Sequence, residues 1–345
     1  MTVDLWHHGD QEVAPGLLDL AVNVRGDRPP PWLRQLLVES LDCLGAYPDP
    51  TAATAAVAGR HGREPGEVLL TAGGAEAFVL LARVLRPRHA VCIHPSFTEP
   101  EAALRAAGHV VHRLVLPPPY VLTAVPDQAD LVIVGNPTNP TGVVHELTRL
   151  CRPGRIVVVD EAFADAVPGE PASLAGRSDL PGLVVVRSLT KTWALAGLRV
   201  GYLLAEPALV HALRRVQPLW SVSTPACVAA AACSSPSAVA EADRAAREAV
   251  GHREHLERAL LDLGVHVSPG SRAPFLLCHS AQRPWLRESL RQRGIAVRRG
   301  ETFPGLSPAH WRVAVRAPQV VAPLLGALTE ILRHPSVDLA PASAS

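Results

Sequence analysis

The sequence predicts an α/β protein, with a mostly parallel, seven-stranded sheet in a large domain and a smaller α+β domain after it. Between Val68 and Ala205, seven short apolar runs alternate with helical patterns. Runs that are apolar on both faces are typical of parallel strands buried on both sides. A long alanine-rich stretch then separates this region from a second, shorter set of strands, and 345 residues are enough for two domains.

Composition excludes several classes of protein. The formal net charge of +1 gives no indication of a nucleic-acid or acidic-membrane partner. The six cysteines form no C-x-x-C pair, as expected for core thiols in a reducing cytoplasm, and the 15 histidines show no metal-binding spacing. We find no signal-peptide pattern and no uncharged apolar run of the ~18 residues that a membrane helix needs. We therefore expect a soluble cytoplasmic protein without a metal.

The chain is expected to begin with an arm over residues 1–22. A strand is predicted within Leu18–Val24, followed by a proline-rich loop. Apolar residues at helical spacing predict a helix over Trp32–Leu44, and an alanine-rich helix over Thr51–His61 follows a turn.

The large domain is expected to span residues 23–220. Helices are predicted over Ala75–Leu85 and Thr98–Ala107. The predicted strands are Val68–Thr71, Ala90–His94, Val110–Leu116, Leu131–Gly135, Ile156–Asp160, Leu183–Ser188 and Val200–Ala205.

The small domain is expected to span residues 221–333. Pro218 to Pro236 is predicted as a transition, and Ala238–Leu263 as one long helix that bridges the two domains. The remaining predicted elements are Phe275–His279, Trp285–Gln292, Ile295–Arg298, Trp311–Arg316 and Val320–Leu332. Residues 334–345, rich in Pro, Ala and Ser, are predicted to form a flexible tail.

Lys191 is the only lysine of the chain, and it follows the predicted strand Leu183–Ser188. Ligands of open parallel sheets bind beyond the carboxyl ends of the strands. An arginine cannot replace this lysine in Schiff-base chemistry, because a guanidinium stays protonated whereas a buried ammonium can lose its proton. An arginine-rich composition could leave one lysine by chance, but it does not explain this position.

Two further motifs suit a phosphate. Gly74, Ala75 and Glu76 open a helix directly after a strand, so that free backbone N–H groups and the helix dipole point at one spot. An ordinary glycine turn would look the same. Three further donors could reach the same phosphate, namely Ser188, Thr190 and Arg199.

Three residues suit a flat, protonated ring. Asp160 ends a predicted strand, and a buried carboxylate needs a cationic partner such as a protonated pyridine nitrogen. The proline-rich loop Asn136–Gly142 can aim the Asn139 amide at a ring hydroxyl, and Phe97 could stack on the ring. The alternatives are a helix-capping aspartate, a tight turn and a core phenylalanine.

Together, Ser188–Tyr202, Asn136–Gly142 and Asp160–Phe163 resemble the fold-type-I pyridoxal-phosphate enzymes of the class I/II aminotransferase family. Within it, the chain is similar to the histidinol-phosphate aminotransferase branch, and most of all to the threonine-phosphate decarboxylases of cobalamin biosynthesis. The resemblance covers nearly the whole chain and implies the pyridoxal-phosphate-dependent transferase fold.

The resemblance also implies roles in cofactor binding. Lys191 would bind pyridoxal 5′-phosphate covalently, Asp160 would pair with the pyridinium and Asn139 with the ring hydroxyl. The cofactor phosphate would be bound by the backbone of Gly74, Ala75 and Glu76, and by Ser188, Thr190 and Arg199. Tyr47 resembles a tyrosine that reaches the phosphate from the partner subunit, which implies a homodimer.

The resemblance also indicates which residues bind the substrate. Arg312 and Arg316 share a face of the predicted strand, and by resemblance Arg312 holds the substrate carboxylate. Arg298 matches an arginine that holds a substrate phosphate, together with Asn23 and His7. The alternative is that these arginines solvate an exposed strand.

The resemblance therefore implies an enzyme that acts on a small phosphorylated amino acid, with decarboxylation favoured over transamination with 2-oxoglutarate. Phe163 stands where the aminotransferase branch usually has tyrosine, whereas His8 stands where the decarboxylases usually have glycine. A non-catalytic binding protein on the same fold is a further alternative.

Overall fold

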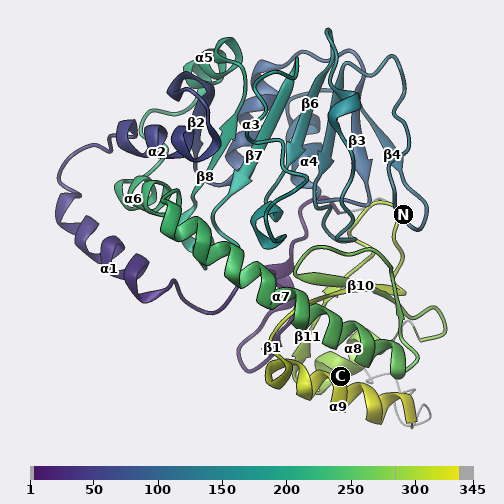
Figure 1. Cartoon of the computed structure of the whole chain (residues 1–345). Helices are drawn as coiled ribbons and strands as arrows, with labels where there is room; N and C mark the ends of the chain where they lie inside the picture. Colours follow the sequence, from purple (N-terminus) through teal and green to yellow (C-terminus); the bar gives the residue numbers. More distant parts are fainter. Residues whose placement is uncertain (1–3, 284, 334–345) are drawn as a thin grey trace, which may run out of the picture.

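A seven-stranded sheet forms the centre of the larger part of the chain (Figure 1). The computed structural model describes residues 4–283 and 285–333. The strands lie in the order β2-β8-β7-β6-β5-β3-β4, and β8 alone runs antiparallel to its neighbours. Their bounds are β2 Val68–Thr71, β3 Ala90–His94, β4 Val111–Val115, β5 Leu131–Gly135, β6 Ile156–Asp160, β7 Leu183–Ser188 and β8 Gly201–Leu204. The predicted fold class, a mostly parallel α/β sheet, is confirmed.

Helices cover both faces of this sheet, because its central strands are apolar on both sides. In β6, Val157 and Val159 pack in one buried cluster and Val158 in another. The first cluster includes residues of α2 Thr51–His61, α6 Thr224–Cys233 and the start of α7 Pro236–Asp262. The second includes residues of α3 Gly74–Val84, α4 Glu99–Ala106 and α5 Pro207–Val216.

The largest difference between the predicted and observed elements is a helix, α6, in a segment that was predicted as a transition. That segment, Pro218 to Pro236, contains all of α6, and α7 begins at its last residue. Ser223 and Ser235 cap these helices by accepting hydrogen bonds from Ala226 N and Ala238 N, and a proline lies in each first turn. Proline is well tolerated there, since the first N–H groups of a helix have no intrahelical partner. Two of the prolines in this segment, Pro225 and Pro236, therefore mark helix starts.

The smaller part of the chain is built on a four-stranded antiparallel sheet in the order β12-β13-β10-β9. Its strands are β9 His266–Val267, β10 Phe275–His279, β12 Arg298–Arg299 and β13 His310–Ala314, and its helices are α8 Leu286–Gln292 and α9 Pro318–Arg333. Helix α7 runs from beside α6 to this smaller part (Figure 1). The predicted tail, residues 334–345, lies outside the described residues.

The N-terminal segment packs on the smaller part. Strand β1, Leu18–Asp19, pairs in parallel with β11, Ile295–Ala296, and Leu20 is fully buried in the same core. The following loop crosses to the larger part, where Arg25 N donates to the carbonyl of Lys191 at 2.8 Å. Helix α1, Pro31–Glu39, continues into a 3-10 turn over Ser40–Cys43. None of the helices in the described ranges has the length and apolar character needed to cross a lipid bilayer.

Candidate active site

A cavity of about 490 Å³ lies where the strand ends of the large sheet meet the smaller part and the N-terminal arm. It brings together all of the predicted site residues except His7, Tyr47 and Glu76. Those that line it are Asn23, Gly74, Ala75, Phe97, Asn139, Asp160, Ser188, Thr190, Lys191, Arg199, Arg298 and Arg312. Segments far apart in the sequence therefore share one chamber.

Lys191 follows β7 and lies in a positive environment. Burial and, after it, the nearby charges of Arg312 and Arg199 lower the pKa of its amine to about 8, although the negative charges of Asp160 and Asp10 act in the opposite direction. Burial disfavours the charged ammonium, because the low-dielectric interior solvates it poorly. The amine can therefore be neutral, and hence nucleophilic, close to neutral pH.

Asp160, at the end of β6, has the opposite shift. Burial raises the pKa of its carboxyl to about 6. The Ala162 N–H, which donates to Oδ1 at 3.1 Å, and the charge of Lys191 oppose that effect without cancelling it. A cation delivered to this carboxylate would remove the cost of burying its charge.

The turn before α3 forms a close-fitting anion cradle. Gly73 has φ +81°, and a Cβ there would lie 2.5 Å from Arg199 Nη2, so that only glycine allows the guanidinium to approach. The hydroxyls of Ser188 and Thr190 are 2.7 Å apart at the same strand end. Backbone N–H groups of a helix start, two hydroxyls and a guanidinium are the donors that a phosphate prefers.

Within the described residues, Arg312 forms hydrogen bonds with neutral groups only. It donates to Asn139 Oδ1 and to the carbonyl of Ala21. With the Asn23 amide oriented so that its oxygen faces Arg312, that oxygen accepts from Nη1 at 3.1 Å and from Nε at 3.3 Å. Burial lowers the pKa of the Arg312 guanidinium to about 9.

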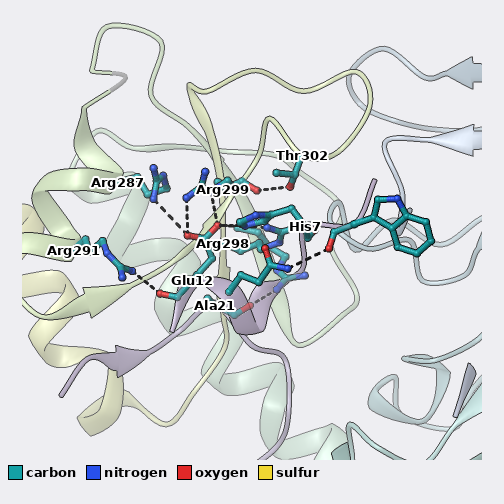
Figure 2. Close-up of polar contacts among 11 residues, drawn as sticks. His7, Glu12, Ala21, Arg287, Arg291, Arg298, Arg299 and Thr302 are labelled. Carbon is teal, nitrogen blue, oxygen red and sulfur yellow. Dashed lines mark hydrogen bonds and ion pairs between the residues drawn. The ribbon is translucent and has the colours of Figure 1, made fainter. Parts of the chain in front are cut away.

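Arg298 lies opposite Arg312 in the register between β12 and β13. Its guanidinium lies over the Phe303 ring, 5.0 Å from the centroid, and its Nη2 donates to the carbonyl of His7 at 2.6 Å. Burial lowers its pKa to about 10. Figure 2 shows it within a cluster of cationic side chains around Glu12.

The cavity does not include three predicted residues. His7 turns its imidazole to Glu12, with 2.9 Å between Nε2 and Oε1, so it does not face a substrate. Glu76 folds back to accept from Ala72 N at 2.6 Å and from Gln217 Nε2 at 3.3 Å, which leaves only its backbone for the anion cradle. Tyr47 is 74% exposed and stacks on Trp220 at 4.1 Å, away from the cavity of its own chain.

Three polar residues of the arm were assigned no role from the sequence, namely His8, Asp10 and Glu12; Asp10 lines the cavity and its charge acts on Lys191. His8 lines the cavity with its ring 5.4 Å from that of Phe97, and its Nε2 is 2.7 Å from Glu99 Oε1. The only sequence signal was its departure from the usual glycine. Glu12 had no signal, because a single acidic residue in a polar arm looks like any solvated carboxylate.

The donor set fits pyridoxal phosphate. The cavity contains an amine with a lowered pKa, a buried carboxylate with a raised pKa, and the anion cradle at the start of α3. These are the partners for an aldehyde, a protonated pyridine nitrogen and a phosphate group, respectively.

Comparison with known proteins gives a consistent result. The model of the family "Aminotransferase class I and II" matches residues 17–328. A histidinol-phosphate aminotransferase of Mycobacterium tuberculosis is 52% identical over 318 residues, 90% of this chain and 86% of that protein. A threonine-phosphate decarboxylase of Salmonella typhimurium is 32% identical over 335 residues, 92% of this chain and 91% of that one. In fold, the chain resembles the histidinol-phosphate aminotransferase from Clostridium acetobutylicum, with a TM-score of 0.81, 23% identity and coverage of 91% and 98%.

Proposed function

Because the chain belongs to the class I and II aminotransferase family, whose members depend on pyridoxal phosphate, we propose that it acts on a small amino acid bearing a phosphate. We further propose that it releases the carboxylate of a threonine-phosphate-like substrate as carbon dioxide. The site residues keep the roles predicted from the sequence, except that His7 supports Arg298 instead of contacting the substrate.

The juxtaposition of Arg298 and Arg312 carries this proposal. The two residues are cross-strand partners, both side chains are buried, and like charges opposite each other destabilise a sheet. The hydrogen-bond partners of Arg312 described above are neutral. Arg298 lies 3.4 Å from Glu12, but that carboxylate also pairs with other arginines. A substrate with two anionic groups would compensate both guanidiniums. Threonine phosphate has a carboxylate and a phosphate, whereas histidinol phosphate has only the phosphate.

When bound, the cofactor supplies an aldehyde for reaction with amines and a ring that withdraws electrons from the substrate. Asp160 would keep a proton on the ring nitrogen, and Asn139 would donate to the ring oxygen through its amide nitrogen, since its Oδ1 already accepts from Arg312. Phe97 would cover the ring, and the anion cradle would hold the phosphate. Lys191 Nζ would act as nucleophile and then move protons at the substrate α-carbon.

The choice of reaction depends on which bond at the α-carbon stands perpendicular to the ring plane. Arg312 is fixed by Asn139 and Ala21 on two sides, so a carboxylate bound to it has little freedom to rotate. Phe163, also at the cavity, provides no phenol hydroxyl for the ring oxygen. Loss of the carboxylate would follow if Arg312 holds it perpendicular to the ring, and the missing phenol distinguishes this site from the usual aminotransferase pattern.

Transamination is the second candidate. The observation that favours it is the 52% identity to proteins named histidinol-phosphate aminotransferases, against 32% to a threonine-phosphate decarboxylase. Under this alternative, Arg312 would bind the carboxylates of glutamate and 2-oxoglutarate.

Assembly and location belong to the same proposal. We propose a cytoplasmic homodimer in which Tyr47 serves the partner's site, with an arm over residues 1–22 and domains over 23–220 and 221–333. Exposed large apolar side chains support a covered surface, because exposed apolar patches mark interaction sites. Trp220 stacks on Tyr47, and several others lie just before Tyr47 or beside Trp220 in the sequence. These exposed side chains include Val38, Leu41, Leu44, Leu219 and Trp220, each more than half exposed.

The test incubates the purified enzyme with threonine phosphate, and separately with histidinol phosphate and 2-oxoglutarate. Carbon dioxide and aminopropanol phosphate from the first incubation would support decarboxylation. Glutamate formed only in the second would replace it by transamination. Lys191→Ala is the matched control: it should abolish both reactions, and a cellular role that persists in this variant would favour a non-catalytic binding protein.

A further inference from the structure

We propose that Glu12 is the positioning residue of the substrate-phosphate subsite: it holds Arg298 and the arm in place and thereby makes the enzyme select substrates that carry a distal dianion. This inference rests on the proposed function for the identity of the substrate. It adds a residue to which the sequence pattern assigned no role.

The contacts of Glu12 join the arm to the smaller part of the chain (Figure 2). Its side chain is 1% exposed. Oε1 accepts from Arg299 Nε at 2.6 Å and from His7 at 2.9 Å. Arg298 Nη1 lies 3.4 Å from the same oxygen, and Arg287 Nη1 lies 3.5 Å from Oε2.

The backbone of Glu12 adds a further contact, because its carbonyl accepts from Arg291 Nη1 at 2.6 Å. Cations from both α8 and β12 therefore converge on this one arm residue.

Glu12 is the shared anchor of this cluster, because its one carboxylate faces three guanidiniums and an imidazole. Glu301 adds negative charge near Arg298 and Arg299, and Glu288 adds it near Arg299. Burial alone would raise the pKa of Glu12, but the bonds from Arg299 and His7 hold it below its usual value, so the carboxylate stays ionised. An ionised Glu12 holds Arg298 through an ion pair, so neutralising Glu12 would leave the guanidinium less well positioned for a phosphate.

Arg298 is the member of the cluster that connects it to the substrate. It lines the cavity with Lys191, whereas Glu12, Arg287 and Arg299 do not. Behind it lie the Phe303 ring, the His7 carbonyl and Glu12, which together fix its guanidinium before a ligand arrives. A fixed donor loses little conformational entropy on binding, and a guanidinium held in place can bind a phosphate through two parallel hydrogen bonds.

The first experiment uses the holoenzyme, in which the cofactor fills its own phosphate site, and titrates it with inorganic phosphate by calorimetry. The variants are Glu12→Gln, which removes the charge at nearly constant volume, and Glu12→Asp, which keeps it. Glu67→Gln is the matched control, because Glu67 pairs with Arg63 far from the arm in sequence. We expect phosphate to bind the wild type and Glu67→Gln alike, and Glu12→Gln about tenfold or more weakly, with Glu12→Asp in between.

The second experiment compares threonine phosphate with unphosphorylated threonine. In Glu12→Gln, KM for threonine phosphate should rise about tenfold with kcat little changed, while kcat/KM for threonine should hardly change. A purely structural role would lower kcat/KM for both substrates by the same factor, and that result would overturn the inference. So would a holoenzyme that binds no inorganic phosphate, or a Glu12→Gln variant that binds it as tightly as the wild type. If Glu12→Gln does not fold, Glu12→Asp must show the same selective loss.

The two proposals can fail separately. A wild type that converts neither form of threonine overturns the proposed reaction, whereas the phosphate titration still decides the role of Glu12.

Discussion

Replacing Asp160 by asparagine should change stability and cofactor affinity in opposite directions. In the protein without cofactor, burial raises the pKa of this carboxyl from the usual 3.8 to about 6. That difference corresponds to about 3 kcal/mol against the ionised form. The asparagine of the variant carries no charge to bury, so we expect the free energy of unfolding of the apoenzyme to rise by up to this amount above pH 6.

The pH dependence follows from the same shift. Between pH 4 and pH 6 the folded apoenzyme binds more protons at Asp160 than the unfolded chain does, so its stability falls as the pH rises through this window. Above pH 6 the full cost is present. Asp160→Asn should lack this contribution. The gain is an upper bound, since Lys191 loses a nearby negative charge in the variant.

Cofactor affinity should fall, because the variant no longer offers a carboxylate to the pyridinium. Loss of a hydrogen bond between charged groups corresponds to about 10- to 100-fold in the dissociation constant. Thermal unfolding of the apoenzyme from pH 4 to pH 8, and absorbance titration with pyridoxal phosphate, measure the two effects. The control is Asp165→Asn, at a second buried carboxyl with a raised pKa. Asp165 lines a neighbouring cavity and not the one that contains Asp160, so the cofactor affinity of this variant should be unchanged. An Asp160→Asn apoenzyme no more stable than the wild type at pH 7.5, or one with unchanged cofactor affinity, would refute the reasoning.

Three further substitutions test the rest of the site. Lys191→Arg should reduce activity by more than about 1000-fold, since a guanidinium makes no imine; borohydride reduction and mass spectrometry should find no cofactor bound covalently, and attachment elsewhere would contradict the assignment. Arg312→Lys should raise KM about 10- to 100-fold through loss of the bidentate contact, and unchanged steady-state kinetics would exclude Arg312 from carboxylate binding. Tyr47→Phe should weaken cofactor binding several-fold only if the chain dimerises, so light scattering should show twice 36.6 kDa; a monomer with full activity would reject the shared site.

The sheet was predictable because its strands are apolar on both faces. Five of the seven strands have the predicted bounds, and the other two differ by one residue at each end. Periodicity was less informative where polar and proline residues dominate. The segment from Pro218 to Pro236 contains α6, whose start depends on the Ser223 cap and a proline in the first turn, a combination that looks like a loop in sequence.

The cofactor part of the candidate site was predictable for a different reason. Its groups are attached to strand ends, so position in the sequence already fixes position in space. The arm gave no such indication: whether His7 or His8 faces the cavity depends on how Glu12 anchors the arm to Arg298 and Arg299, which lie more than 280 residues later. Such a contact exists only after the whole chain has folded.

The contrast between the strand ends of the large sheet and the arm also explains why the family is evident from the sequence whereas the reaction is not. The larger part of the chain provides the anion cradle, Asp160 and Lys191, groups suited to a cofactor whatever the substrate. The smaller part provides Arg298 and Arg312, two buried cations that are cross-strand partners. Arg298 has Glu12 at 3.4 Å, whereas Arg312 donates to Asn139 and to the carbonyl of Ala21, which are neutral. Binding a substrate with both anions would therefore stabilise the contact between arm and smaller part and fix the α-carbon relative to Lys191 at the same time. A substrate with one anion would leave one of the two guanidiniums without a substrate anion, and its α-carbon would be freer to rotate. Under the proposed function, the number of negative charges on the substrate would therefore decide how firmly the breaking bond is held.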